Sequence, residues 1–205
     1  MRAIHQALRR DAARLEEVAP RLEGSKSVPA PVREGWQEFR DELVRHHEAE
    51  DDDLWPVLRA RLRDPNDLRE VELMVDEHGQ LQHAIDAVDR ALSHHTDVLA
   101  AAHTLAGSLR DHLDHEERTI FPLLEHHLSR REWQTFLLTE RRRTPLRHRP
   151  EFLAWVLEDA TKRDTEAVLA ELPPPGRVAY RRILGPRYAA KHRWHPRGTA
   201  PQPES

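Results

Sequence analysis

The sequence predicts an all-α protein in which four longer helices are followed by a shorter helical extension. The chain has 205 residues, only seven glycines and few β-branched residues, a composition that favours helix over strand. Apolar residues recur every three or four positions through four long stretches, and turn-forming residues separate these stretches. Cysteine is absent, which excludes disulfides, thiolate catalysis and iron–sulfur clusters.

The first two helices are separated by a stretch rich in turn-forming residues. We expect the first helix over residues 2–19, with Leu8 on its apolar side, and a loop over residues 20–31. Pro31 suits the start of the second helix. Because proline has no N–H and its ring crowds the preceding turn, we expect Pro56 to kink this helix or to end its regular hydrogen bonding.

The third and fourth helices begin at recognisable turns. Residues 64–67, with the sequence Asp-Pro-Asn-Asp, predict a turn and a helix start, and the third helix carries its apolar positions as far as Leu92. Thr96 and Asp97 open the fourth helix, which carries apolar positions as far as Leu124. The four helices together predict a bundle over residues 1–128.

The remaining residues, 129–205, predict a basic helical extension. Ser129 and Glu132 have the spacing of a capping box, which opens a further helix. Short helices are expected over residues 151–160 and 165–172, followed by a break at the Pro-Pro-Pro-Gly run of residues 173–176. One more helix is expected over residues 177–195, with an interruption at Gly185-Pro186. From Pro196 the chain is expected to be disordered.

The charges are unevenly distributed between the two parts. Residues 1–128 carry 16 Lys and Arg against 27 Asp and Glu, whereas residues 129–205 carry 16 against 9. A basic segment could bind nucleic acid. We favour two other interpretations, in which the segment packs against the acidic part or its arginines are solvated. No stretch of 18 apolar residues occurs and the N-terminus has no signal-like run, so we expect a soluble cytoplasmic protein without a membrane partner.

Two passages of the sequence, residues 46–56 and 112–122, match each other at an offset of 66 residues. Each begins with a His, places a Glu four residues later and ends in an aromatic-proline dipeptide. A lone His followed three residues later by Leu precedes each passage, at His5 and at His78. With 15 histidines in the chain, an isolated His-Glu pair would be unremarkable. The repetition of the whole pattern favours a functional site.

This spacing suits a metal site inside a bundle. Residues four apart lie on one face of a helix, so a His and a Glu in that relation can bind the same ion. Two such helices, with one His from each of two others, would hold two ions in the manner of carboxylate-bridged bundles. Imidazole and carboxylate are ligands of iron, manganese and zinc. The candidate ligands are His5, His46, Glu50, His78, His112 and Glu116.

The pattern of a lone His followed by His-x-x-x-Glu, repeated twice, resembles the hemerythrin-like (HHE cation-binding) family over about residues 1–128. The resemblance implies an up-down-up-down four-helix bundle with an oxo- or hydroxo-bridged pair of non-haem iron ions, manganese or zinc being less expected. It implies that the six candidate residues are the iron ligands. Residues 129–205 resemble extensions of some members of the family more weakly.

One departure from the oxygen-carrying members bears on function. They have a second His one turn after the third-helix ligand, where this chain has Gln82. We therefore expect two imidazoles per iron and catalase-like breakdown of hydrogen peroxide or handling of nitric oxide. The alternative is a module that binds or senses O₂, NO or iron without turnover, and the sequence leaves open whether the protein is an enzyme. His47 is expected to be solvated or to support the ligands from behind, and His115 and Glu117 to lie off the ligand face.

Overall fold

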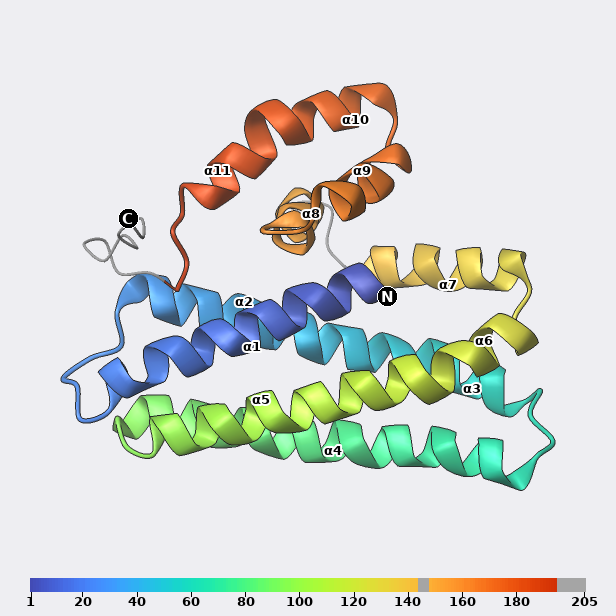
Figure 1. The fold of residues 1–205 in the computed structure, drawn as a ribbon, viewed down its shortest axis with the longest axis horizontal. Coiled ribbons are helices and arrows are strands. Elements are labelled where there is room, and N and C mark those ends of the chain that lie inside the picture. Colours follow the sequence, from blue (N-terminus) through green and yellow to red (C-terminus); the bar gives the residue numbers. More distant parts are fainter. Residues whose placement is uncertain (144–147, 195–205) are drawn as a thin grey trace.

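The computed structural model describes residues 1–143 and 148–194 of the chain. Four antiparallel helices form an up-down-up-down bundle, and a group of shorter helices lies across one side of it (Figure 1). The predicted all-α bundle with a C-terminal helical extension is confirmed. The bundle helices are α1 (Arg2–Leu22), α2 (Ala30–Ala49), α4 (Pro65–His94) and α5 (Val98–His115).

The first loop is shorter than expected, because α1 continues through Pro20 to Leu22. A proline near the end of a helix removes only one backbone hydrogen bond of the last turn. Burial of Ala19 and Leu22, which are 0% and 2% exposed, holds this turn against the bundle. The other starts agree with the sequence: α2 has proline in its first turn, and the side chain of Asp64 caps α4 by accepting from the N–H of Asn66 at 2.8 Å.

Each of the two aromatic-proline dipeptides follows a π-helical turn. The turn η1 (Glu50–Leu54) leads into α3 (Trp55–Arg59), and η2 (Glu116–Ile120) leads into α6 (Phe121–His127). A proline in a regular α-helix would leave a carbonyl without its donor and would clash with it, and a π turn relieves both problems. The break expected at Pro56 is therefore confirmed, and it takes the form of a wider turn rather than the end of the helix.

The extension consists of short helices. Its first helix, α7 (Arg130–Arg143), starts with the predicted capping box, since the backbone N–H of Ser129 donates to Glu132 at 2.9 Å and the N–H of Glu132 donates to the Ser129 hydroxyl at 3.4 Å. The helices α8 (Arg149–Leu157), α9 (Lys162–Ala170), α10 (Pro174–Ala179) and α11 (Gly185–Ala189) follow, with the π turn η3 (Tyr180–Leu184) before α11.

The break expected at the proline run is present but shorter than expected. Pro173 lies in the connection after α9, whereas Pro174 and Pro175 form the first turn of α10, a position to which proline is well suited. The interruption near Gly185-Pro186 is present as the π turn η3. The predicted disordered tail from Pro196 lies outside the described residues.

The extension is attached to the bundle by buried polar and apolar contacts. The indole N–H of Trp155 in α8 donates to the buried carboxylate of Asp11 in α1 at 2.8 Å. Near the C-terminal end, Trp194 is 1% exposed and lies against Gly35 of α2. Residues of the extension, including Trp155 and Trp194, belong to the same apolar cluster as the core of the bundle.

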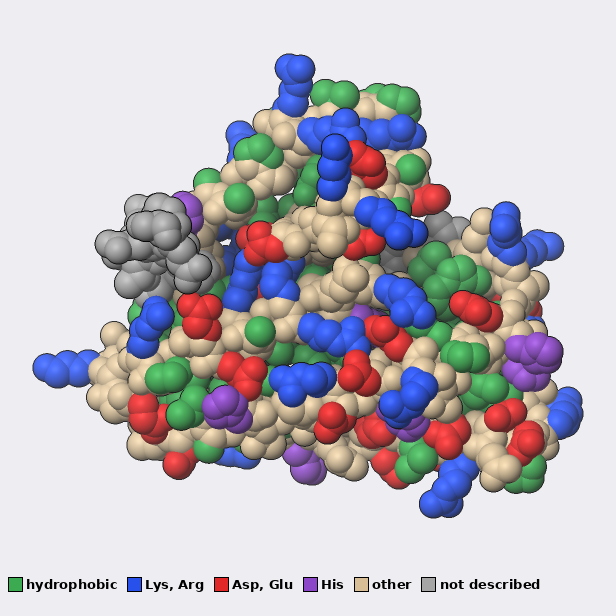
Figure 2. Space-filling view, in the orientation of Figure 1, with side chains coloured by type: hydrophobic (Ala, Val, Ile, Leu, Met, Phe, Trp, Pro, Cys, Tyr) green, Lys and Arg blue, Asp and Glu red, His purple; other side chains and the backbone are tan. Residues whose placement is uncertain are grey.

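Ion pairs also join the extension to the bundle, and each of the two parts supplies cations as well as anions to them. Arg143 of the extension binds Asp53 at 2.7 Å, and Arg14 of the bundle binds Glu158 at 2.6 Å. Figure 2 shows Lys and Arg side chains over the upper helices of the extension. The basic extension thus packs against the acidic part, as the charge distribution favours. Among the described residues, no helix is long and apolar enough to cross a membrane.

Candidate metal centre

A layer of buried polar side chains divides the core of the bundle. One apolar cluster contains Leu43, Leu81 and Leu113, and the other contains Ala49, Met74 and Ile120. The layer lies where α2, α4 and α5 pass from the first cluster to the second, and α1 contributes to it near its N-terminus. All six histidines and glutamates predicted as ligands lie in this layer and are at most 5% exposed: His5, His46, Glu50, His78, His112 and Glu116.

Four of these residues form one group whose potential ligand atoms lie within 4.8 Å of one another: His5, His46, Glu50 and Glu116. The Nε2 atoms of His5 and His46 are 3.3 Å apart. Nε2 of His5 lies 3.1 Å from Oε2 of Glu116, and Nε2 of His46 lies 3.3 Å from Oε1 of Glu50. Two imidazoles and two carboxylates thus converge on a space that could hold one cation.

A second group consists of three imidazoles, from His47, His78 and His112, under the same distance limit. Nε2 of His78 lies 3.5 Å from Oε2 of Glu50, the carboxylate that also reaches the first group. Glu50 therefore has one oxygen toward each group. Among the described residues, these two groups could hold two neighbouring cations with a carboxylate between them.

Most of the atoms that face this space have no hydrogen-bond partner in the protein. The Nε2 atoms of His47, His78 and His112 and both carboxylate oxygens of Glu50 and Glu116 are buried without a hydrogen bond. Buried polar atoms without partners cost free energy, and an anion without a nearby positive charge costs more. Nitrogen and oxygen donors of these types suit a divalent or trivalent transition metal. The residues present therefore fit a metal centre.

Outer carboxylates fix the orientation of three of the imidazoles. In each, Nδ1 donates to a carboxylate and leaves Nε2 as the atom that faces the space, as is usual behind metal-bound histidines. The pairs are His5 with Glu117 at 2.8 Å, His78 with Asp51 at 2.9 Å and His112 with Glu77 at 2.9 Å. His115 extends the last of these pairs, since Nδ1 of His115 lies 2.8 Å from Glu77 and Nε2 lies 2.8 Å from Glu70.

Burial and neighbouring charges shift the pKa values of the histidines and glutamates in the layer. Burial lowers the pKa of His46 and of His47 well below the ordinary value, and neighbouring imidazoles lower it further. Burial also lowers the pKa of His5, but the neighbouring carboxylates of Glu116 and Glu117 outweigh this effect and raise the pKa to about 9. Burial, followed by the Glu116 carboxylate, raises the pKa of Glu50. The neutral imidazoles of His46 and His47 are in the form that binds a metal, and binding would release protons from the other groups.

One residue of the layer was not anticipated from the sequence. His47 is 7% exposed and contributes to the second group, so of the two expectations for it, solvation is wrong and a position among the ligands or directly behind them is left. The sequence does contain a signal for the burial of His47, because this residue follows Leu43 by one turn and so continues the apolar face of α2. Gln82 lies on the surface and donates to Asp86 at 2.9 Å. His115 and Glu117 lie off the ligand face, as expected, but they support the histidines from behind.

The comparisons with known proteins agree with this geometry. The model of the family described as the hemerythrin HHE cation-binding domain matches residues 1–124. The chain therefore belongs to the hemerythrin HHE cation-binding family. No curated protein and no solved structure matches the chain.

Proposed function

We propose that this protein is a non-haem di-iron protein that acts on small oxygen species. The observation that carries the proposal is the meeting of two groups of ligand atoms at Glu50 in a buried layer. In this proposal one iron binds His5 and His46, the other binds His78 and His112, and the carboxylates of Glu50 and Glu116 lie between them. Carboxylate-bridged pairs of this kind are built in bundle cores from ligands on facing helices.

We include His47 as a further ligand, next to His78 and His112. Its unpartnered Nε2 and its burial support this assignment. It would give the second iron three imidazoles even though Gln82 does not face the site. The absence of a histidine at position 82 is therefore no reason to exclude reversible binding of O₂.

A different observation favours turnover over reversible binding. Glu117, Asp51 and Glu77 each accept a hydrogen bond from the Nδ1 of an imidazole, and such contacts make the imidazole a stronger donor. Stronger donors favour the oxidised metal, which suits reactions with peroxide better than storage of O₂. A bound iron pair would supply two-electron chemistry at neighbouring ions. The chain supplies the ligands, their orientation and a buried site.

The activity that we propose is catalase-like, with two molecules of hydrogen peroxide giving O₂ and two of water. The purified iron-loaded protein should release O₂ from hydrogen peroxide faster than the same amount of free iron. Reduction of nitric oxide is the second candidate activity at the same centre and is measured by NO consumption under anaerobic conditions. Glu116→Ala should abolish peroxide turnover together with iron binding, because Glu116 is a shared carboxylate in the proposal.

The control is Glu48→Ala, because Glu48 is exposed in the last turn of α2, two residues before Glu50. It should retain both iron and activity. A fully iron-loaded protein that forms a stable, reversible O₂ or NO adduct without turnover would contradict the catalytic proposal. The protein would then bind or sense these ligands, which is the alternative that the sequence leaves open.

A further inference from the structure

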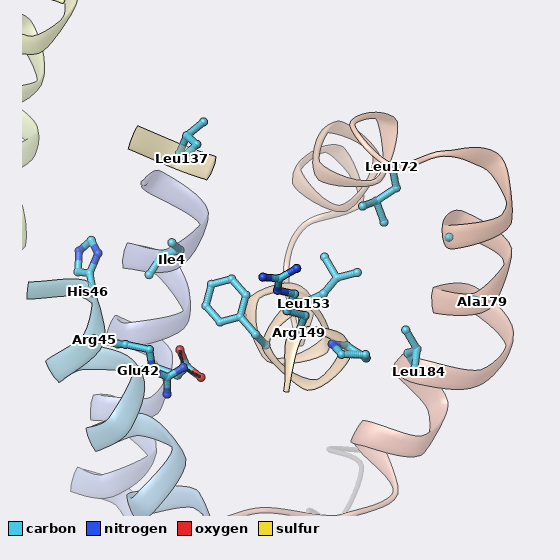
Figure 3. Close-up of a pocket in the computed structure, with 13 residues that line it drawn as sticks. Ile4, Glu42, Arg45, His46, Leu137, Arg149, Leu153, Leu172, Ala179 and Leu184 are labelled. Carbon is cyan, nitrogen blue, oxygen red and sulfur yellow. Dashed lines mark hydrogen bonds and ion pairs between the residues drawn. The ribbon is translucent and has the colours of Figure 1, made fainter. Parts of the chain in front are cut away.

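A cavity of about 450 Å³ lies between the bundle and the extension. Its inner wall comes from α1 and α2, and its outer wall comes from the extension (Figure 3). The apolar side chains that line it include Ile4 on the bundle side and Phe152, Leu153, Leu172 and Leu184 on the extension side. The cavity thus depends on the extension, which lies outside the part of the chain that matches the family model.

The polar part of the cavity lies on α2, beside the metal centre. Glu42, Arg45 and His46 all line it. Nη1 of Arg45 donates to both carboxylate oxygens of Glu42 at 3.0 Å. His46 belongs to the first ligand group, so the cavity leads from the extension to the edge of the metal centre.

The polar groups of the cavity favour an uncharged ligand. The carboxylate of Glu42 offsets the guanidinium of Arg45, and Arg149 on the opposite wall takes part in a further interaction. An anionic ligand would lie beside the buried carboxylate of Glu42, which disfavours its binding. An uncharged group that both donates and accepts hydrogen bonds matches an ion pair that offers a donor and an acceptor.

We propose that this cavity binds an uncharged organic molecule with an apolar body and one hydroxyl or hydroperoxyl group, held with that group toward Glu42, Arg45 and His46. Its volume is within the range of small-molecule sites, and its wall combines mostly apolar side chains with a few polar groups at one place, as such sites do. Burial raises the pKa of Glu42 to about 7 against the opposing effect of Arg45, so near neutral pH this carboxyl group can donate or accept. The proposal concerns binding and does not require that the centre turns over peroxide.

The test uses the iron-loaded full chain and 2-phenyl-2-propanol, the redox-inert alcohol that corresponds to cumene hydroperoxide. Titration calorimetry should show saturable binding at one site. Leu153→Trp and Leu172→Trp, which fill the cavity from α8 and from the connection after α9, should each weaken binding at least tenfold. The matched control is Val178→Trp, since Val178 lies in the same extension but is 56% exposed and does not line the cavity. It should bind like the wild type.

Two further measurements test the orientation and the class of ligand. Saturation with the alcohol should shift the optical bands of the bound iron, because the polar end of the ligand lies beside His46. Benzoate, an anion of similar size, should bind at least tenfold more weakly. Absence of saturable binding of the alcohol, equal weakening in Val178→Trp, unchanged iron bands or tighter binding of benzoate would each overturn the proposal. Failure of peroxide turnover alone would contradict the proposed activity and leave this inference standing.

Discussion

At the scale of single residues, the orientation of the imidazoles is set by groups behind them. His5, His78 and His112 each have Nδ1 on a carboxylate, which leaves Nε2 directed at the same space. This arrangement fixes the tautomer of each ring, because the nitrogen that donates carries the hydrogen. The outer carboxylates are therefore as important for the geometry of the centre as the inward-facing Nε2 atoms.

The first prediction concerns His47, the residue of the centre that the repeat does not contain. His47→Ala should lower the iron content toward one ion per chain, because the second group would keep only two imidazoles. Elemental analysis of the purified variant measures this. His83→Ala is the control, since His83 is exposed on α4 near His78. A variant that retains two tightly held irons would show that His47 is not a ligand.

The second prediction concerns Glu42 and pH. Burial raises its pKa from 4.5 in the unfolded chain to about 7 in the folded protein, against the opposing effect of Arg45. The folded state therefore holds this proton more tightly, so the contribution of Glu42 to stability is greatest below pH 4.5 and falls as the pH rises toward 7. The loss is on the order of 2–3 kcal/mol by linkage.

Glu42→Gln should remove this loss, because glutamine cannot ionise. Urea unfolding of metal-free wild type and variant, followed across this pH interval, should show the variant gaining stability relative to the wild type as the pH rises. The exposed change Glu34→Gln should leave the pH profile unaltered. A variant whose difference from the wild type is the same at every pH would contradict the shifted pKa.

The candidate ligands could be predicted because of the repeat, and His47 could not be selected by the same reasoning. The offset of 66 residues relates His46 to His112 and Glu50 to Glu116. Position 113, which corresponds to His47, is Leu113, so the repeat itself gave no reason to include His47. Only the position of His47 on the apolar face of α2 indicated burial, and many polar residues next to such a face are solvated.

At the scale of helices, the two prolines shape the backbone beside the centre. The N–H of Trp55 donates to the carbonyl of Glu50, and that of Phe121 donates to the carbonyl of Glu116, so a π turn begins at each of these two buried glutamates. Pro56 made a break in the second helix predictable, whereas the break at Pro122 was not predicted, and the form of both breaks depends on packing. Leu54 and Ile120 are 1% and 0% exposed, and the wider turn lets them reach the second apolar cluster.

The third prediction concerns the attachment of the C-terminal end to α2. A Cβ atom at Gly35 would lie 2.6 Å from Cε2 of Trp194, closer than side-chain atoms pack. Gly35→Ala should therefore destabilise the fold by about 1–3 kcal/mol through overpacking, and it should expose Trp194. Chemical unfolding and a red shift of the tryptophan emission measure the two effects.

The control for Gly35→Ala is another glycine inside a helix. A Cβ atom at Gly107 of α5 would meet nothing within 4 Å. Gly107→Ala should stabilise the protein by about 0.5–1 kcal/mol, because alanine favours helix more than glycine does. Equal effects of the two changes would show that Trp194 does not pack against Gly35 in solution.

At the scale of the whole molecule, the sequence predicted the helices better than the contacts of the extension. The spacing of apolar residues and the turn residues located the bundle helices, because each of these helices buries one apolar face in the core. The contact of Trp155 with Asp11 and that of Trp194 with Gly35 join residues more than 140 positions apart, and no local pattern encodes such a pair. The division of the chain at residue 128 stays a prediction, since both apolar clusters include residues of both parts.

The fourth prediction is that a bound metal stabilises the entire fold. The layer buries carboxylates and imidazoles, and most of the atoms that face its centre have no hydrogen-bond partner. A cation that binds only the folded state therefore adds stability by mass action. Removal of iron by a chelator should lower the melting temperature, and restoring iron should raise it again. Identical melting curves for the two forms would mean that the layer is stable without a metal.

The central claim is that the buried layer holds two metal ions that share carboxylates. The most direct measurement is the iron content of the purified chain by elemental analysis, compared between wild type and Glu50→Ala. Because Glu50 has one oxygen toward each ligand group, the account predicts two irons per wild-type chain and loss of both ions in the variant. One zinc and no iron in the wild type after growth with ample iron, or full iron occupancy in Glu50→Ala, would contradict the account.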